Sequence, residues 1–137
     1  MPLQKLDHVN VRTHDLDRAV EFYGRVLDLK PGPRPAFPFP GAWLYCGDQA
    51  VVHLVTVGQE PAAYRSDQSL EHYALSASGL AEFLGHLRAN KVAYKCGVLP
   101  GEGWGHTQVN IFDADGNHLH IDFPPGEEAD LAEYDGR

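Results

Sequence analysis

The chain has 137 residues, of which 43% are hydrophobic and 22% are charged, as in an ordinary soluble globular domain. Its net charge is −8, and its 11 Lys and Arg residues form no cluster, which argues against a nucleic acid or an anionic membrane as partner. The sequence has no apolar run of about 18 residues and no signal-peptide core at its start, so we expect a cytoplasmic protein.

The chain begins with the first copy of an internal repeat. Residues 6–11 read Leu-Asp-His-Val-Asn-Val, and residues 70–75 read Leu-Glu-His-Tyr-Ala-Leu, 64 positions later. An amphipathic helical pattern follows each copy, with Asp15 as the N-cap of the first and Ser78-Gly79 opening the second. The apolar stripes of the two helices are Leu16, Ala19, Val20, Phe22, Tyr23 and Val26, and then Leu80, Phe83, Leu84 and Leu87. Two copies of this length indicate duplication of one supersecondary unit.

Short strand-like segments follow each helix. Five prolines within residues 31–40 exclude a central strand and predict a rigid, extended loop. We place the boundary between the halves near residues 58–67 and expect the acidic tail from Pro124 to be loosely held. The predicted strands are 42–47 and 50–57 in the first half, and 94–98, 107–112 and 118–123 in the second, with a turn at 113–117.

Three motifs together resemble the vicinal oxygen chelate superfamily, the glyoxalase, bleomycin-resistance and extradiol dioxygenase group. They are Leu-Asp-His-Val at 6–9, Asp-Leu-Asp-Arg-Ala-Val-Glu-Phe-Tyr at 15–23 and Asp-Ala-Asp-Gly-Asn at 113–117. The resemblance spans residues 5–124. It implies an α+β fold in which two paired βαβββ modules, 5–57 and 69–123, form a curved mixed sheet around a shared cleft within one domain, 1–137. Because fold alone does not fix function, the activity has to come from the site.

The resemblance also implies a metal site. Metal-using members take ligands from the first and last strand of each module, and these positions are His8, His53, His72 and His120. Alternation along a strand agrees, since each histidine lies opposite an apolar face. Imidazole ligands without thiolates suit zinc, iron, nickel, cobalt or copper. For the remaining histidines we expect solvated or hydrogen-bonded roles: His14, His86, His106 and His118.

Three functions stay open at this point. His120 stands where the family usually has Glu, and a metal-bound imidazole has no lone pair with which to take a proton. This weakens a standard glyoxalase mechanism, leaves the catalytic residue unknown, and makes Asp122 and Glu102 candidate bases. An extradiol dioxygenase site usually combines two histidines with one carboxylate, so that function is weakened as well. The third function is a metal-free binding protein of the bleomycin-resistance kind.

A small-molecule substrate and a homodimer are the expected partners, the dimer because open sheets leave edges to cover. The two cysteines, Cys46 and Cys96, are expected to be reduced thiols. The residues expected to contact the substrate from the cleft face are Asn10, Arg12, Trp43, Gln108 and Asn110.

Overall fold

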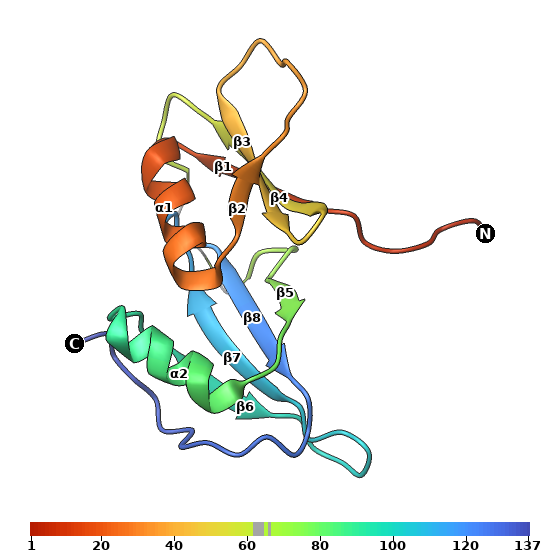
Figure 1. Ribbon diagram of the computed structural model, residues 1–137, viewed down its shortest axis with the longest axis vertical. Helices are drawn as coiled ribbons and strands as arrows, with labels where there is room; N and C mark the ends of the chain where they lie inside the picture. The colour runs from red at the N-terminus through yellow and green to blue at the C-terminus, as the bar shows by residue number, and fades with distance from the viewer. Residues whose placement is uncertain (62–64, 66) are drawn as a thin grey trace. The chain divides into compact units, whose positions relative to one another are not determined.

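The computed structural model describes residues 1–61, 65 and 67–137, and the chain divides into two compact units, 1–62 and 63–137. Each unit has a strand, a helix and three further strands, so the predicted α+β fold of two βαβββ modules is confirmed (Figure 1). We call the two units module 1 and module 2. The boundary expected near residues 58–67 falls partly outside the described residues, and the limits 5–57 and 69–123 stay a prediction, as does the shared cleft.

Module 1 has one helix packed on a four-stranded sheet of order β1-β4-β3-β2. The edge strand β1 pairs with β4 in parallel, and the other neighbours are antiparallel. Leu44, Val52 and Leu54 of the sheet are fully buried together with Tyr23 of the helix. The elements are β1 (Val9–Thr13), α1 (Leu16–Leu27), β2 (Lys30–Gly32), β3 (Gly41–Cys46) and β4 (Gln49–Thr56).

Module 2 repeats this topology with the sheet order β5-β8-β7-β6, in which the edge strand β5 is parallel to β8 and the other neighbours are antiparallel. Its helix contacts the sheet through Phe83 and Phe123, whose ring centroids lie 5.4 Å apart. Leu119 and Val109 are fully buried beneath it. The elements are β5 (Tyr73–Ser76), α2 (Leu80–Ala89), β6 (Lys95–Val98), β7 (Thr107–Phe112) and β8 (His118–Phe123).

The two helices begin in different ways. Asp15 caps α1, because its carboxylate accepts a hydrogen bond from the Arg18 N–H at 3.1 Å. The N-cap of α2 is Gly79, which has no side chain and a positive φ of 84°. Its N–H donates instead to the carboxylate of Glu127 at 2.7 Å.

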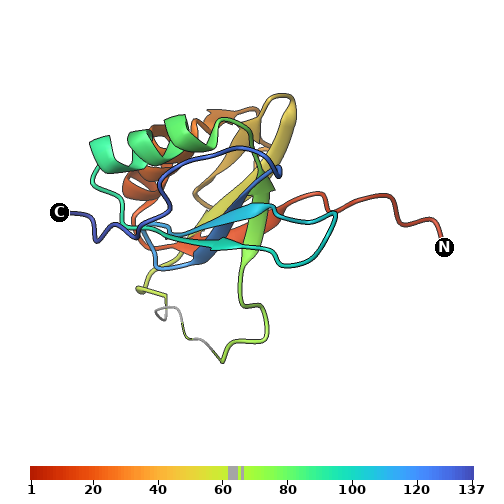
Figure 2. The same cartoon turned by 90° about the horizontal axis from the view of Figure 1, so that it is seen from below.

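The C-terminal tail corrects one expectation. We expected it to be loosely held, but it runs back along α2 (Figure 2) and is fixed at two points. One is the Glu127 contact, and the other is a mutual pair of backbone hydrogen bonds between Tyr134 and Tyr94, at 2.9 and 3.1 Å. Hydrogen bonds to other residues of module 2 therefore fix a segment whose acidic composition had predicted a loosely held tail.

The remaining differences are small. The proline-rich segment contains no central strand, as predicted, although its first residues belong to the three-residue strand β2 at the sheet edge. The first strand of each module starts one residue after the repeated histidine, at Val9 and Tyr73. Cys46 and Cys96 are free thiols. No helix within the described residues is long and apolar enough to cross a membrane.

Candidate functional site

Module 1 brings two of the predicted ligands together. His8 lies just before β1, and His53 lies on β4, whose backbone pairs with β1 in the register Asn10 to His53. The two imidazole rings stack with centroids 3.7 Å apart and planes 11° apart. His53 is buried, with 8% of its surface exposed, and the indole of Trp43 covers its ring at 3.9 Å.

Each of these rings has one nitrogen bonded to an oxygen that can only accept. The Nδ1 of His8 lies 2.7 Å from the Asp7 carboxylate, and the Nε2 of His53 lies 3.2 Å from the Ala50 carbonyl. These nitrogens therefore carry the hydrogens of the neutral rings. The lone pairs stay on Nε2 of His8 and Nδ1 of His53, where a metal ion could use them.

Module 2 repeats the arrangement. The rings of His72 and His120 stack with centroids 3.8 Å apart and planes 16° apart. Glu71 takes the place of Asp7, because its carboxylate accepts from the Nδ1 of His72. His120 is 8% exposed, and its Nδ1 is buried without a hydrogen-bond partner. A buried ring nitrogen without a partner is costly unless a ligand engages it, so the donor set fits a metal ion.

Strand register makes the correspondence between the modules explicit. In module 1 Val9 pairs with Val52, and in module 2 Tyr73 pairs with Leu119. His53 and His120 each follow the second residue of these pairs, so they occupy equivalent positions. The loop lengths of the two halves differ and hide this equivalence in the sequence.

Burial and a neighbouring histidine lower the pKa of both buried rings. The pKa of His53 is lowered, first by burial and then by the neighbouring His8. The pKa of His120 is lowered by burial and then by His72 and His118. A metal ion competes with protons for the ring nitrogens, so lowered pKa values favour binding at neutral pH. The pKa values of Asp7 and Glu71 are also lowered, mainly by their hydrogen bonds with His8 and His72.

His118 is the residue that the sequence argument left out of this group. Ligand atoms of His72, His118 and His120 all lie within 4.8 Å of one another, which makes the three a candidate metal-binding cluster. However, both ring nitrogens of His118 are engaged. Nδ1 lies 3.0 Å from the Glu71 carboxylate, and Nε2 lies 2.8 Å from the Asn110 side-chain oxygen. The hydrogen-bonded role expected for His118 therefore agrees with its contacts. Because side chains alternate along a strand, His118 lies on the same face of β8 as His120, two residues later.

Of the residues expected to contact a substrate, two lie beside a predicted histidine ligand and the others do not. Trp43 pairs with His53 across β3 and β4, and Asn110 pairs with His120 across β7 and β8, so both flank a histidine. Arg12 and Asn10 are exposed on β1. Gln108 pairs with Asp122, two residues beyond His120.

Of the candidate bases, Glu102 is exposed in a loop, whereas Asp122 has one carboxylate oxygen buried without a partner.

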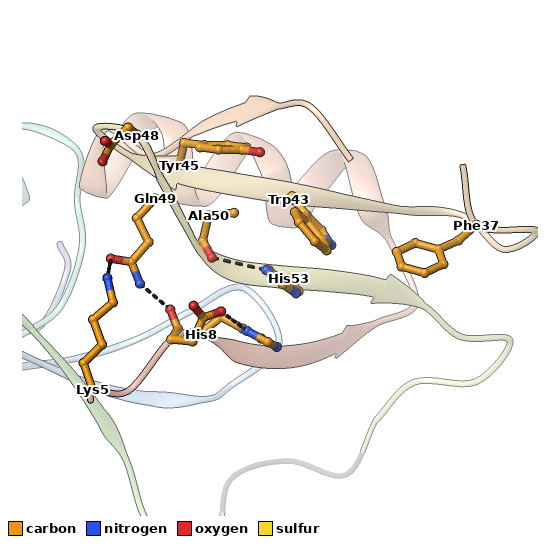
Figure 3. Close-up of a pocket in the computed structure, with 10 residues that line it drawn as sticks. Lys5, His8, Phe37, Trp43, Tyr45, Asp48, Gln49, Ala50 and His53 are labelled. Atoms are coloured by element: carbon orange, nitrogen blue, oxygen red, sulfur yellow. Dashed lines mark hydrogen bonds and ion pairs between the residues drawn. The ribbon is translucent and has the colours of Figure 1, made fainter. Parts of the chain in front are cut away.

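Module 1 also contains an open pocket of about 700 Å³ above its histidine pair (Figure 3). Trp43, Tyr45 and Phe37 contribute aromatic rings to its lining, together with the imidazoles of His8 and His53. Its remaining lining residues are Lys5, Asp7, Asp48, Gln49 and Ala50.

Comparison with known proteins supports the same fold. The family model of the Glyoxalase/Bleomycin resistance protein/Dioxygenase superfamily matches residues 5–121. A glyoxylase/bleomycin resistance protein/dioxygenase domain from Frankia sp. EAN1pec superposes with a TM-score of 0.73 at 19% identity, covering 92% of this chain and 96% of its own. A glyoxalase/dioxygenase from Nostoc punctiforme gives 0.70 at 19%, covering 90% and 93%.

A lactoylglutathione lyase from Agrobacterium tumefaciens superposes with a TM-score of 0.66 at 20% identity, covering 90% of this chain and 96% of the lyase. No curated protein matches the chain. At these identities the likeness concerns the fold, and the chemistry has to be argued from the residues of the site.

Proposed function

The chain belongs to the Glyoxalase/Bleomycin resistance protein/Dioxygenase superfamily, and on that premise we propose that it is a metal-dependent enzyme acting on a small oxygenated substrate. One divalent ion would be held by His8, His53, His72 and His120. Zinc, iron, nickel and cobalt suit such imidazole ligands. The reaction is glyoxalase-like or dioxygenase-like, and the substrate would bind through two of its oxygens.

The observation that carries this proposal is the repeated unit of carboxylate and two stacked histidines. Asp7, His8 and His53 form it in module 1, and Glu71, His72 and His120 form it in module 2. A carboxylate that accepts from a ligating histidine fixes its tautomer and makes the other nitrogen a better donor. A histidine needed only for packing would not require this arrangement twice at equivalent positions.

The ion would supply a Lewis acid that polarises a substrate oxygen. The protein's own residues would orient the substrate and move its proton. Asp122 is the best-placed base, since it lies on β8 two residues beyond His120 and has one carboxylate oxygen buried without a partner. An imidazole that binds a metal has no free lone pair, so His120 cannot take this role.

A metal-free binding protein is the second candidate. It is favoured by the module 1 pocket, which is open, aromatic on one side and lined by the carboxylates of Asp7 and Asp48. Such a pocket could hold an organic ligand without any metal chemistry. The unpartnered Nδ1 of His120 argues for the first candidate.

Elemental analysis of protein purified without an affinity tag separates the two candidates. We expect close to one equivalent of a transition metal after loading with Zn²⁺, Fe²⁺ or Ni²⁺, and the same amount in His86→Ala, whose exposed side chain lies on α2. Wild type that takes up no metal would leave only the binding protein. For the loaded enzyme, oxygen uptake on catechols would favour the dioxygenase-like reaction. Oxygen-independent turnover of the thiohemiacetal of glutathione and methylglyoxal would favour the glyoxalase-like one.

A further inference from the structure

His8 lies on a segment that the sheet of module 1 does not itself hold. β1 begins at Val9, and its register with β4 starts at the pair of Val9 and Val52, so His8 precedes the ladder. Residues 1–8 are exposed, and Figures 1 and 2 show them leading away from module 1 toward the N-terminus. The His8 ring is nevertheless stacked on the buried ring of His53 at 3.7 Å. Contacts outside the ladder therefore have to fix its direction.

These contacts come from the first residue of β4. The side-chain amide of Gln49 donates from Nε2 to the Asp7 carbonyl at 2.6 Å, and its Oε1 accepts from the Lys5 ammonium at 3.0 Å. The two bonds use opposite ends of the amide, so together they fix its orientation. Figure 3 shows the bond between Lys5 and Gln49, with the Gln49 side chain directed toward the segment of His8. The amide thus joins this segment to β4 across 42 and 44 positions of sequence.

Gln49 can serve as an anchor because it stands at the base of a tight hairpin. It pairs with Cys46 across β3 and β4, and the turn between them has Gly47 at a φ of 61°. Glycine adopts this positive φ without strain, as tight hairpin turns require. The next residue, Ala50, accepts at its carbonyl from Nε2 of His53 at 3.2 Å. Two neighbouring residues of β4 therefore hold the two stacked histidines, one through a side chain and one through the backbone.

A chain of hydrogen bonds leads from Gln49 to the free lone pair of His8. The amide holds the backbone of Asp7, and the Asp7 carboxylate accepts from Nδ1 of His8 at 2.7 Å, which leaves the lone pair on Nε2. Loss of the amide would release the Asp7 backbone and, with it, the direction of the carboxylate and the ring. Module 2 has Gly116 at the equivalent position, four residues before His120, so its stacked pair does not have this tether.

We propose that Gln49 is a positioning residue that sets the direction of the His8 lone pair. It acts through the backbone of Asp7 and is not itself a ligand. The inference rests on the proposed function only where it makes His8 a metal ligand, since a ligand that is already oriented binds with less loss of freedom. The stack of His8 on His53 exists without a metal, so the role of Gln49 is measurable in metal-free protein.

The test compares the two stacked pairs within one sample of the metal-free full chain. Stacked rings shift each other's proton NMR signals, so the imidazole protons report on each stack separately. In Gln49→Ala the ring signals of His8 should move most of the way toward those of a solvated histidine at the same pH. The ring signals of His72 should stay at their wild-type positions, because module 2 has no glutamine in this place. A general loss of structure would move both sets of signals.

The metal-loaded protein gives the second readout. Metal affinity, measured by competition with a chromogenic chelator, should fall about three- to tenfold in Gln49→Ala. This loss is smaller than that expected when a carboxylate bonded directly to a ligand is removed, because Gln49 acts one hydrogen bond further away.

Two further variants assign the effect to one hydrogen bond. In Gln49→Glu the carboxylate can still accept from Lys5 but cannot donate to the Asp7 carbonyl, so this variant should behave as Gln49→Ala does. Gln59→Ala changes an exposed residue of module 1 and should match wild type in both readouts. Wild-type behaviour of Gln49→Glu would overturn the role assigned to the bond with Asp7.

Wild-type ring signals of His8 in Gln49→Ala would overturn the inference. Equal displacement of the His72 signals would overturn it too, since the substitution would then loosen the chain as a whole. Wild-type protein that takes up no metal would contradict the proposed function, but the metal-free spectra would still decide the role of Gln49. The failure of this inference is therefore distinguishable from failure of the proposed function.

Discussion

The two modules repeat one framework and differ beside their histidines. Each places a carboxylate, a histidine before its first strand and a buried histidine on its last strand in the same register. Beside the buried histidine, module 1 has Trp43 where module 2 has Asn110. The carboxylate and the two histidines, which both modules share, are the groups that the proposed metal ion would need. The residue beside the buried histidine differs, so that module 1 has an aromatic pocket there and module 2 has a network of polar side chains.

The largest effect should come from the histidines that precede the first strand of each module. His8→Ala and His72→Ala should each lower metal affinity by at least about a hundredfold, since each removes a ligand nitrogen oriented by a carboxylate. Competition with a chromogenic chelator measures the affinity. If His8→Ala binds metal as tightly as wild type while His72→Ala does not, the site belongs to module 2 alone.

The carboxylate partners should matter less than the ligands. Asp7→Asn and Glu71→Gln keep the shape of the side chain but can no longer hold the histidine N–H as a charged acceptor. A loss of about ten- to a hundredfold in metal affinity is expected for each. Glu71→Gln should have the larger effect, because Glu71 is bonded to both His72 and His118. The reverse order would show that the His118 contact adds nothing, and Glu102→Gln in an exposed loop is the control.

The helix caps give a comparison that concerns stability alone. Asp15→Ala removes a cap next to its own helix, and Glu127→Ala removes one that the tail brings to α2. Each should lower the free energy of unfolding by about 1 kcal/mol, as measured by urea denaturation. Glu128→Ala, an exposed neighbour, should change little. An unchanged midpoint in Glu127→Ala would mean that the tail does not support α2.

The smallest effect is expected at His118. The equivalent position in module 1 is Val51, and module 1 still stacks its two histidines without a third. His118→Val should therefore change metal affinity by less than about threefold, because both nitrogens of His118 bond to protein groups instead. A tenfold or greater loss, measured by the same chelator competition, would make His118 a ligand.

Much of this framework could be predicted from the sequence because its determinants are local. Alternation around His8 and His72 and the stripe beginning at Leu16 each depend on residues within one element. The turn at 113–117 is local too. The carboxylate of Asp113 accepts from the N–H groups of Asp115 and Asn117, both at 2.9 Å, so the motif has a structural role there.

The rest depends on contacts between residues far apart in the chain, which a pattern does not encode. Glu127 caps α2 from 48 positions away, and Tyr134 pairs with Tyr94. The contact of His118 with Glu71 spans 47 positions. The sequence predicted a loosely held tail and left His118 out of the ligand group, because the residues that contact them lie too far away in the chain to be identified from local sequence. The Trp43 and His53 stack was also hidden, since it follows from the register of β3 against β4.

The proposed function has one metal ion bound by histidines of both modules, and counting the ions bound per chain tests this proposal most directly. Chelator-treated, untagged protein is titrated with Co²⁺ or Zn²⁺, and the tightly bound metal is counted after gel filtration. We predict one ion per folded chain, retained in His86→Ala and lost in both His8→Ala and His72→Ala. Two ions per chain, with one remaining in each single variant, would mean that each module binds its own ion, and no bound ion in wild type would contradict a metal site altogether.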